Sequence, residues 1–319
     1  MIEVRNLTKH YGDFTAISNV SFDVKSGEIV GFLGPNAAGK TTTMRVITGY
    51  LSPSAGSVKV DGYDVYEQGM QVKKIIGYLP EKPPVYPDLS VRSYLKFVAE
   101  IKGVPSREIN KNVEAAMEKT AVTGVANKLI GNLSKGYQQR VGLAQSLVHN
   151  PKVLILDEPT VGLDPTQIIE VRNLIKGLKD SHTVVLSTHI LPEVSMTCSR
   201  VVIINKGNII AEDTPSNLTK KVATDETIEL VVSGASDDKK LKEMLTSLDG
   251  VRSADVTFSE TDKTHKASII VKSSFDNAPE VAQKIISLNL KLHKMNTVEL
   301  SLEEAFLRLV NSMKGDEQK

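Results

Sequence analysis

Cysteine, tryptophan and long apolar runs are nearly absent from this sequence. The 319 residues include one cysteine, Cys198, and no tryptophan, and aromatic residues make up 5% of the chain. A single thiol excludes an intramolecular disulfide and a CxxC metal or redox site. We therefore expect Cys198 to be a small buried side chain in a reducing compartment.

No apolar run approaches the ~18 residues that a membrane-spanning helix needs. The longest, Val153 to Leu156 and Val201 to Ile204, have the length of strands. The N-terminus starts with an alternating pattern and lacks the basic stub and apolar segment of a signal peptide. We expect a cytoplasmic protein, and if it works at a membrane, another chain spans that membrane.

A strong charge of one sign is also missing. Lysine and arginine total 39 and aspartate and glutamate total 38, so the formal net charge is +1. A nucleic-acid backbone is normally bound by a marked excess of positive charge. The composition therefore predicts no nucleic-acid partner.

The order of the hydrophobic patterns predicts two domains, in line with a length beyond the usual limit of one core. Residues 1 to about 30 alternate like short antiparallel strands, whereas 28–33, 153–157 and 183–188 are continuous apolar runs typical of a parallel sheet buried on both faces. Residues of about 82–145 form a helical insertion that starts with a proline-rich loop. We predict a doubly wound α/β domain over residues 1–220, with an antiparallel β subdomain.

A different pattern fills residues 225–319. Strand, helix, strand, strand, helix and strand are predicted at 227–232, 237–248, 251–258, 267–271, 278–288 and 290–295. This βαββαβ order predicts a ferredoxin-like α+β accessory domain. A closing helix over 301–310 begins with Ser301 and Glu304 as a capping box, before the polar tail 315–319.

GPNAAGKT carries the strongest chemical signal, because it lies between a buried strand and a helical stretch. It fits the phosphate-binding pattern G-x-x-x-x-G-K-S/T, in which backbone N–H groups and a helix dipole converge on phosphates. Lys40 would reach the β and γ phosphates, and the Thr41 hydroxyl would ligate Mg²⁺. An ordinary glycine turn would not require these two side chains together. We predict a P-loop NTPase core whose nucleotide contacts are Gly34, Pro35, Asn36, Ala37, Ala38, Gly39, Lys40, Thr41 and Thr42.

Three further side chains stand at the carboxyl ends of buried strands. Asp157 suits the Mg²⁺ shell, and Glu158 suits the orientation and deprotonation of an attacking water. A strand-end acidic cap is the alternative, but it explains the pair poorly beside a phosphate loop. His189 lies on the same rim, where we expect contact with the γ-phosphate. We interpret the other histidines as packed or surface residues: His10, His149, His182, His265 and His293.

Five motifs in order, GPNAAGKT, LSKGYQQR, VLILDEP, GLDP and STH, resemble the ATP-binding subunit of ABC transporters from Met1 to about Ala211. The resemblance implies that Tyr11 stacks on adenine and that Ser134 and Gly136 bind the γ-phosphate of ATP held by the other subunit of a head-to-tail dimer. It also implies communication between the two sites through the loop around Asp164.

The same resemblance implies an ATPase with ATP and Mg²⁺ as cofactors, acting as a homodimer or as a dimer with a similar subunit. It would power a separate transmembrane permease from the inner face of the cell membrane. GYLPE and SLEEAFLRLV are similar to the gliding-motility and copper-maturation groups of the type-2 exporter class, which favours export.

Four positions depart from the family pattern. Ala37 replaces a common glycine, which implies strain if its φ is positive. Lys135 and Tyr137 replace the usual glycine and glutamine of the turn, as is familiar in type-2 exporters. Glu81 stands where the family has a metal-binding glutamine, and we predict that Glu81 still reaches Mg²⁺ or its water.

Two other functions remain open from the residues. A soluble ABC ATPase acting mechanically on DNA or the ribosome would usually show a long coiled-coil insertion or two fused cassettes, and this chain has neither sustained heptads nor a second phosphate loop. A binding switch would depend on nucleotide occupancy alone. Steady ATP hydrolysis that falls when Glu158 is changed would exclude the switch.

Overall fold

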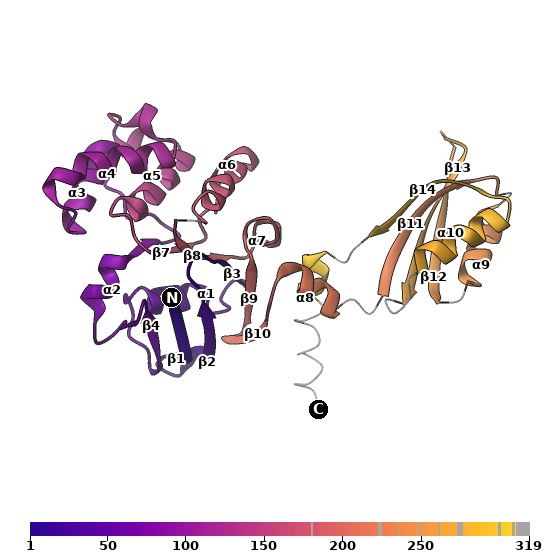
Figure 1. Cartoon of the computed structure of the whole chain (residues 1–319), viewed down its shortest axis with the longest axis horizontal. Helices are drawn as coiled ribbons and strands as arrows, with labels where there is room; N and C mark the ends of the chain where they lie inside the picture. Colours follow the sequence, from indigo (N-terminus) through magenta and orange to yellow (C-terminus); the bar gives the residue numbers. More distant parts are fainter. Residues whose placement is uncertain are drawn as a thin grey trace. The chain divides into compact units, whose positions relative to one another are not determined.

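The computed structural model describes residues 1–310 except 180, 223–224, 236, 249, 261, 273–276, 299–300 and 308–309. The chain divides into two compact units, Met1–Pro215 and Ser216–Lys319, each with its own core (Figure 1). The polar tail and residues 308–309 of the predicted closing helix lie outside the described residues.

A six-stranded sheet forms the centre of the first unit. Its strands follow the order β10 (Asn208–Asp213), β9 (Arg200–Asn205), β3 (Ile29–Leu33), β8 (Thr183–Thr188), β7 (Val153–Asp157) and β6 (Ile76–Leu79). All neighbours are parallel except β10 and β9. Every residue of β3, β7 and β8 is buried, as the continuous apolar runs predict. The carboxyl ends of the parallel strands therefore meet at one edge.

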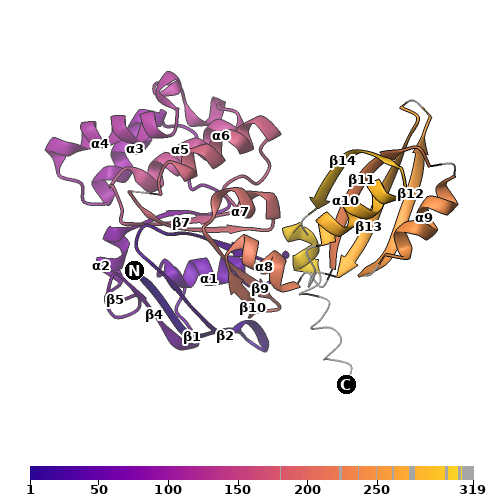
Figure 2. The ribbon, with the colours of Figure 1, turned by 45° about the vertical axis from the view of Figure 1, so that its right-hand side comes forward.

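An antiparallel sheet packs on the other side of helix α1 (Lys40–Ile47) (Figure 2). Its order is β2 (Phe14–Val24), β1 (Ile2–Tyr11), β4 (Ala55–Val60) and β5 (Tyr63–Asp64). Met44 and Ile47 of α1 share one core with side chains of both sheets. This packing fixes the start of α1 beside the carboxyl end of β3.

The helical insertion has a separate core that includes Tyr94, Leu95, Val113 and Met117. It comprises α3 (Val91–Ile101), α4 (Ser106–Lys119), η1 (Thr123–Val125), η2 (Ile130–Asn132) and α5 (Lys135–Leu147). The other helices of the first unit and the segment after it are α2 (Gly69–Ile75), α6 (Pro165–Lys176), α7 (Leu191–Thr197) and α8 (Pro215–Val222). No helix in the described part of the chain has the length and hydropathy to span a membrane.

Cys198 is buried, and burial raises the pKa of its thiol to about 12.

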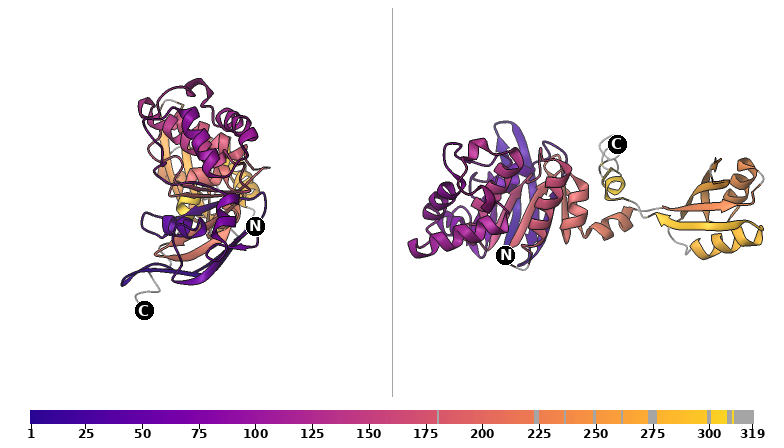
Figure 3. Two further views of the ribbon diagram at one scale, coloured as in Figure 1. Left: turned by 90° about the vertical axis from the view of Figure 1, so that its left-hand side faces the viewer. Right: turned by 90° about the horizontal axis from the view of Figure 1, so that it is seen from above.

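The second unit is a two-layer α+β structure (Figure 3). Its elements are β11 (Asp225–Ser233), α9 (Asp238–Thr246), β12 (Val251–Ser259), β13 (Thr264–Lys272), α10 (Asn277–Ser287) and β14 (Lys291–Val298). The antiparallel order β12-β13-β11-β14 is that of a ferredoxin-like sheet. Residues 302–307 are helical, and the capping box is confirmed: Glu304 N donates to Ser301 Oγ at 3.2 Å, and Ser301 N donates to Glu304 Oε2 at 3.1 Å.

Candidate functional site

The phosphate loop is wound so tightly that two of its positions require glycine. A Cβ at Gly34 would lie 2.3 Å from the carbonyl oxygen of Ile204. Gly39 has φ 108°, and a Cβ there would lie 2.8 Å from the carbonyl oxygen of Ala16. Ala37 has φ 63°, so the condition under which strain was expected at this position is met, and the left-handed conformation costs about 1 kcal/mol without glycine.

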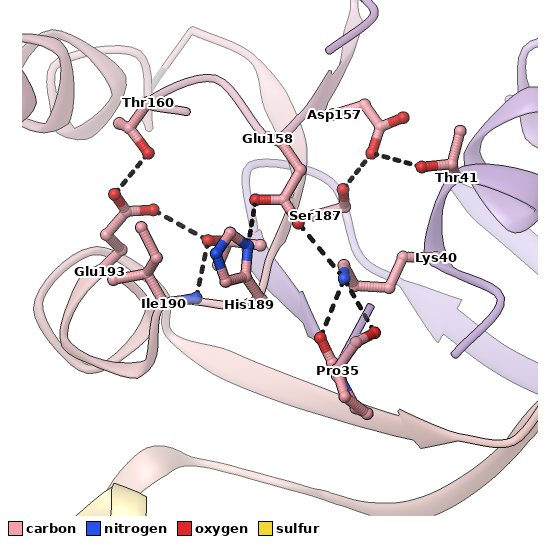
Figure 4. Close-up of polar contacts among 12 residues, drawn as sticks. Pro35, Lys40, Thr41, Asp157, Glu158, Thr160, Ser187, His189, Ile190 and Glu193 are labelled. Carbon is pink, nitrogen blue, oxygen red and sulfur yellow. Dashed lines mark hydrogen bonds and ion pairs between the residues drawn. The ribbon is translucent and has the colours of Figure 1, made fainter. Parts of the chain in front are cut away.

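Lys40 lies between this loop and the end of β7 (Figure 4). Its Nζ donates to the carbonyl oxygens of Gly34 at 2.9 Å and Pro35 at 3.2 Å, and it lies 3.2 Å from Oε1 of Glu158. An ammonium group has three N–H donors, so these three contacts occupy it fully. The lysine is therefore buried, oriented and neutralised by groups of this chain.

Glu158 connects Lys40 to His189. The His189 Nδ1 lies 2.9 Å from Oε2 of Glu158, so each carboxylate oxygen has its own partner (Figure 4). Glu158 has φ 50°, an uncommon conformation for a side chain of this size, which turns it away from the direction of β7. Three segments that follow separate strands thus supply one continuous row of charged and polar groups.

Asp157 is fully buried at the end of β7. Its Oδ1 accepts hydrogen bonds from Ser187 Oγ and, at 3.4 Å, from Thr41 Oγ1, whereas Oδ2 has no partner among the described residues. Burial raises the pKa of Asp157, hydrogen bonds from Ser187 and Thr41 oppose that rise, and the charges of Glu158 and Glu81 add to it. A cation bound at Oδ2 would favour the charged form of Asp157 and lower its pKa.

The oxygen donors here fit Mg²⁺, which prefers carboxylate, hydroxyl and phosphate oxygens. Asp157 Oδ2 is an unpaired buried acceptor beside the Thr41 hydroxyl. No cluster of three His, Cys, Asp or Glu suited to a metal occurs among the described residues.

A pocket of about 550 Å³ collects most of the predicted nucleotide residues. Its lining is Tyr11, Phe14, Ala16, Asn36, Ala37, Gly39, Lys40, Thr41, Thr42, Glu81, Glu158, Val161 and His189. Of the remaining predicted loop residues, Pro35 contributes its carbonyl to Lys40, and Ala38 is packed in the core.

Phe14 is a pocket residue that motif analysis missed. It pairs with Tyr11 across the two-residue turn of the β1–β2 hairpin, and the two rings are 62% and 45% exposed. Directly opposed residues of an antiparallel pair point to the same face. The spacing Tyr-Gly-Asp-Phe is a signal that could have identified the second aromatic ring.

Glu193 is a second residue near the site that no sequence motif identifies. It is 2% exposed on α7 and accepts hydrogen bonds from Thr160 Oγ1 and, at 3.0 Å, from Thr188 Oγ1. The Thr188 hydroxyl in turn accepts from Ile190 N at 3.0 Å. Glu193 thus ties the loop that follows Glu158 to the loop that holds His189 (Figure 4).

The structure does not bring Ser134, Gly136 or Asp164 into the phosphate-loop pocket. Ser134 is the N-cap of α5 and accepts from Tyr137 N at 3.4 Å, and Asp164 is the N-cap of α6 and accepts from Gln167 N at 2.9 Å. A separate hollow of about 540 Å³ is lined by Gly136, Tyr137, Arg140, Asp164, Pro165, Thr166, Gln167 and Glu170. The two predicted halves of a nucleotide site are therefore distinct surfaces of one chain.

Comparison with known proteins gives a consistent result. A protein-family profile described as ABC transporter matches residues 17–161. The uncharacterized ABC transporter ATP-binding protein YxlF of Bacillus subtilis is 39% identical over 209 residues, which are 66% of this chain and 69% of that protein. YhcH of the same organism, also an uncharacterized ABC transporter ATP-binding protein, is 31% identical over 324 residues, 100% of this chain and 98% of that protein. The bacitracin transport ATP-binding protein BcrA of Bacillus licheniformis is 36% identical, over 69% and 72%.

Two solved structures show the same fold. A subunit of an ABC transporter complex from Clostridium perfringens has a TM-score of 0.62 and 30% identity, over 69% of this chain and 93% of that chain. A dimeric ATP-binding cassette in a post-hydrolysis state, bound to ADP and Pi, has a TM-score of 0.62 and 26% identity, over 67% and 98%. These neighbours confirm the P-loop NTPase fold class.

Proposed function

The chain belongs to the family of ABC transporter ATP-binding proteins, and we propose that it hydrolyses ATP to power export through a separate membrane permease. The observation that carries the proposal is the row Lys40, Glu158 and His189 in one pocket with the phosphate loop. A lysine for phosphate, a carboxylate for water and an imidazole for the departing phosphoryl group are the parts that phosphoryl transfer to water needs.

The loop amides and the start of α1 would hold the triphosphate. Lys40 would exchange its contacts with Gly34, Pro35 and Glu158 for phosphate oxygens, which frees Glu158 Oε1 to accept a proton from the attacking water. His189, on the other oxygen of Glu158, would orient the carboxylate and contact the γ-phosphate. Mg²⁺ held by Thr41, Asp157 and Glu81 would neutralise phosphate charge.

Glu158→Gln is the decisive variant, because it keeps the shape of the side chain and removes the base. We expect it to bind MgATP, to accumulate as a dimer on size exclusion, and to hydrolyse ATP at least ~100-fold more slowly. Glu118→Gln, an exposed change on α4, is the matched control. Rapid turnover by Glu158→Gln would refute the assignment of the base.

Glu81 lines the pocket and raises the pKa of Asp157, which supports a place near the metal. We propose that it binds Mg²⁺ directly or through water. Glu81→Gln should change the Mg²⁺ affinity and the ATPase rate, measured by titration of metal at saturating ATP. If neither quantity changes, Glu81 has no such role.

The dimer proposal rests on Ser134 and Gly136, which lie at the N-terminus of α5 and outside the phosphate-loop pocket of the same chain. We propose that they bind the γ-phosphate of ATP in a second copy or a similar subunit. Ser134→Asp keeps an N-cap oxygen but adds a negative charge. In the Glu158→Gln background it should abolish the ATP-dependent dimer and leave ATP binding unchanged, whereas Ser134→Thr should keep the dimer. Deletion from residue 225 tests whether the accessory domain strengthens that dimer.

An exposed aromatic cluster on the helical insertion supports docking of a permease. The rings of Tyr86 and Phe97 lie 5.7 Å apart and are 51% and 39% exposed. Exposed aromatic clusters mark interaction sites. We propose that this surface binds the permease at the inner face of the cell membrane. Phe97→Ser should reduce the amount of a polytopic membrane protein that co-purifies, and Tyr66→Ser should not. Co-purification of ribosomes or another soluble complex instead would favour the alternative function, a soluble ABC ATPase that acts mechanically on a non-membrane partner.

A further inference from the structure

Another pocket lies at the opposite edge of the six-stranded sheet, where β6 and β7 begin. Its volume is about 650 Å³. Lys74 precedes β6, and His149 and Asn150 precede β7, whereas the phosphate loop follows the carboxyl end of β3. Its lining includes Lys74, Lys102, Glu108, Lys111, Lys119 and His149. It shares no residue with the nucleotide pocket.

The pocket concentrates positive charge in a chain whose charges otherwise balance. Four lysines line it, and the single carboxylate in the lining, Glu108, lies 3.4 Å from Arg107. Lys111 and Lys119 lie two helical turns apart on one stripe of α4, with the small Ala115 between them. Within the described residues, neither of these two lysines forms an ion pair. Such lysines at a concave surface attract an anion.

The inner wall of the pocket includes the ammonium group of Lys102, which two backbone hydrogen bonds hold in place. Lys102 Nζ donates to the carbonyl oxygens of Lys73 at 3.0 Å and Ile76 at 3.2 Å. Burial lowers the pKa of Lys102, and the charge of Lys73 lowers it further. Because an ammonium has three donors, one remains for a ligand.

The same wall carries an acceptor without a donor. His149 Nε2 lies 3.1 Å from the Ile76 carbonyl oxygen, so this nitrogen bears the hydrogen, and the buried Nδ1 has no partner among the described residues. Burial and then the charge of Lys102 lower the pKa of His149 to about 4, which keeps the ring neutral. A buried acceptor of this kind favours a ligand with a hydroxyl group.

We propose that this pocket binds a phosphate ester that also carries a hydroxyl group. The lysines would neutralise the phosphate, the hydroxyl would donate to His149 Nδ1, and Val104, Leu147 and Val148 would contact the carbon skeleton. A soluble phosphorylated metabolite and the headgroup of an anionic phospholipid share this chemistry. The site is independent of ATP hydrolysis, so its test does not depend on the proposed transport function.

The first experiment titrates the full-length protein with glycerol 3-phosphate by calorimetry, with the phosphate loop already saturated by MgADP. We expect one binding event per chain. Lys111→Glu/Lys119→Glu should weaken it at least ~10-fold, because two attractive charges become repulsive. Lys59→Glu/Lys128→Glu makes the same charge change at exposed lysines outside the pocket and should leave the affinity unchanged.

Two more measurements separate the ligand sources and test the hydroxyl. Sedimentation with phosphatidylglycerol vesicles detects binding to a lipid headgroup, and phosphatidylcholine vesicles are the control. If the protein binds only the phosphatidylglycerol vesicles, and does so through the lysines, the ligand is the lipid. If it binds free glycerol 3-phosphate, the ligand is the soluble ester. His149→Phe should weaken glycerol 3-phosphate binding but not sulfate binding, since sulfate has no hydrogen to donate. Binding to neither probe, or equal binding by the parent protein and the Lys111→Glu/Lys119→Glu variant, would overturn the proposal.

Discussion

Lys40 Nζ lies 3.2 Å from Glu158 Oε1, and both side chains are more than nine-tenths buried. The lysine that would bind phosphate and the carboxylate that would activate water therefore neutralise each other. In such a buried pair, removing one partner leaves the other charge poorly compensated. The nucleotide must replace one set of contacts with another.

The ion pair predicts a specific double-mutant result. Lys40→Met should lower the affinity for ATP at least ~10-fold and destabilise the fold by about 1–3 kcal/mol, because Glu158 loses its cation. Lys40→Met/Glu158→Gln should recover most of the stability but none of the affinity. Urea unfolding and nucleotide titration of the four proteins measure both quantities. Equal stability of the two lysine variants would contradict the coupling.

Glu193 should act as a positioning residue. Glu193→Ala removes the acceptor of the Thr160 and Thr188 hydroxyls, so the loops that hold Glu158 and His189 lose their link. We expect kcat to fall ~10–100-fold with a smaller change in KM, because a small displacement of reacting groups has a large kinetic effect. Ser195→Ala, on the exposed side of the same helix, is the control. A rise in KM with unchanged kcat would place Glu193 in ground-state binding instead.

The phosphate loop predicts opposite responses to two small substitutions. Ala37→Gly relieves a left-handed alanine, and we expect a stability change between about zero and +1 kcal/mol, since the added freedom of the unfolded chain offsets part of the gain. Gly39→Ala should lose at least ~1 kcal/mol, because its Cβ would meet the Ala16 carbonyl at φ 108°. Denaturant titrations compare the two. A stabilised Gly39→Ala protein would show that the loop has another conformation.

Acid should destabilise the first unit through two buried histidines. Burial and Lys102 lower the pKa of His149 from 6.5 to about 4, and burial, followed by Lys119, lowers the pKa of His182. Both rings gain protons more readily when unfolded, so their stabilisation is present above pH 6.5 and is lost as the pH falls below it, for His149 through a folded-state pKa of about 4. For His149 the loss approaches about 3 kcal/mol. Unfolding free energies at pH 7.5 and 4.5 should differ less for His149→Gln than for the parent.

Local patterns were sufficient to predict the parallel core. Continuous apolar runs identified β3, β7 and β8, and a phosphate loop between strand and helix predicted which edge of the sheet would bind the nucleotide. Because parallel strands share their carboxyl edge, Lys40, Asp157 and His189 could be predicted to converge before any distance was known.

Contacts between distant segments were not predictable in this way. Glu193 has no fixed spacing from Thr160, and only the packing of α7 beside β8 brings them together. The lysine pocket draws its lining from α2, α4 and α5, from the end of α3 and from the segments that follow α3 and α5, so no local window contains it. The proposed roles of Ser134, Gly136 and Asp164 depend on a second chain and remain predictions.

The β1–β2 hairpin also affects which nucleotide the protein selects. Beside the two exposed rings of Tyr11 and Phe14, the hairpin contributes only Ala16 to the pocket, so the Tyr11 hydroxyl is its one side-chain hydrogen-bonding group there. Aromatic rings stack on every nucleobase with similar energy. If this hairpin holds the base, the protein would accept guanine nearly as well as adenine, and the abundance of each nucleotide in the cell would decide which one is consumed.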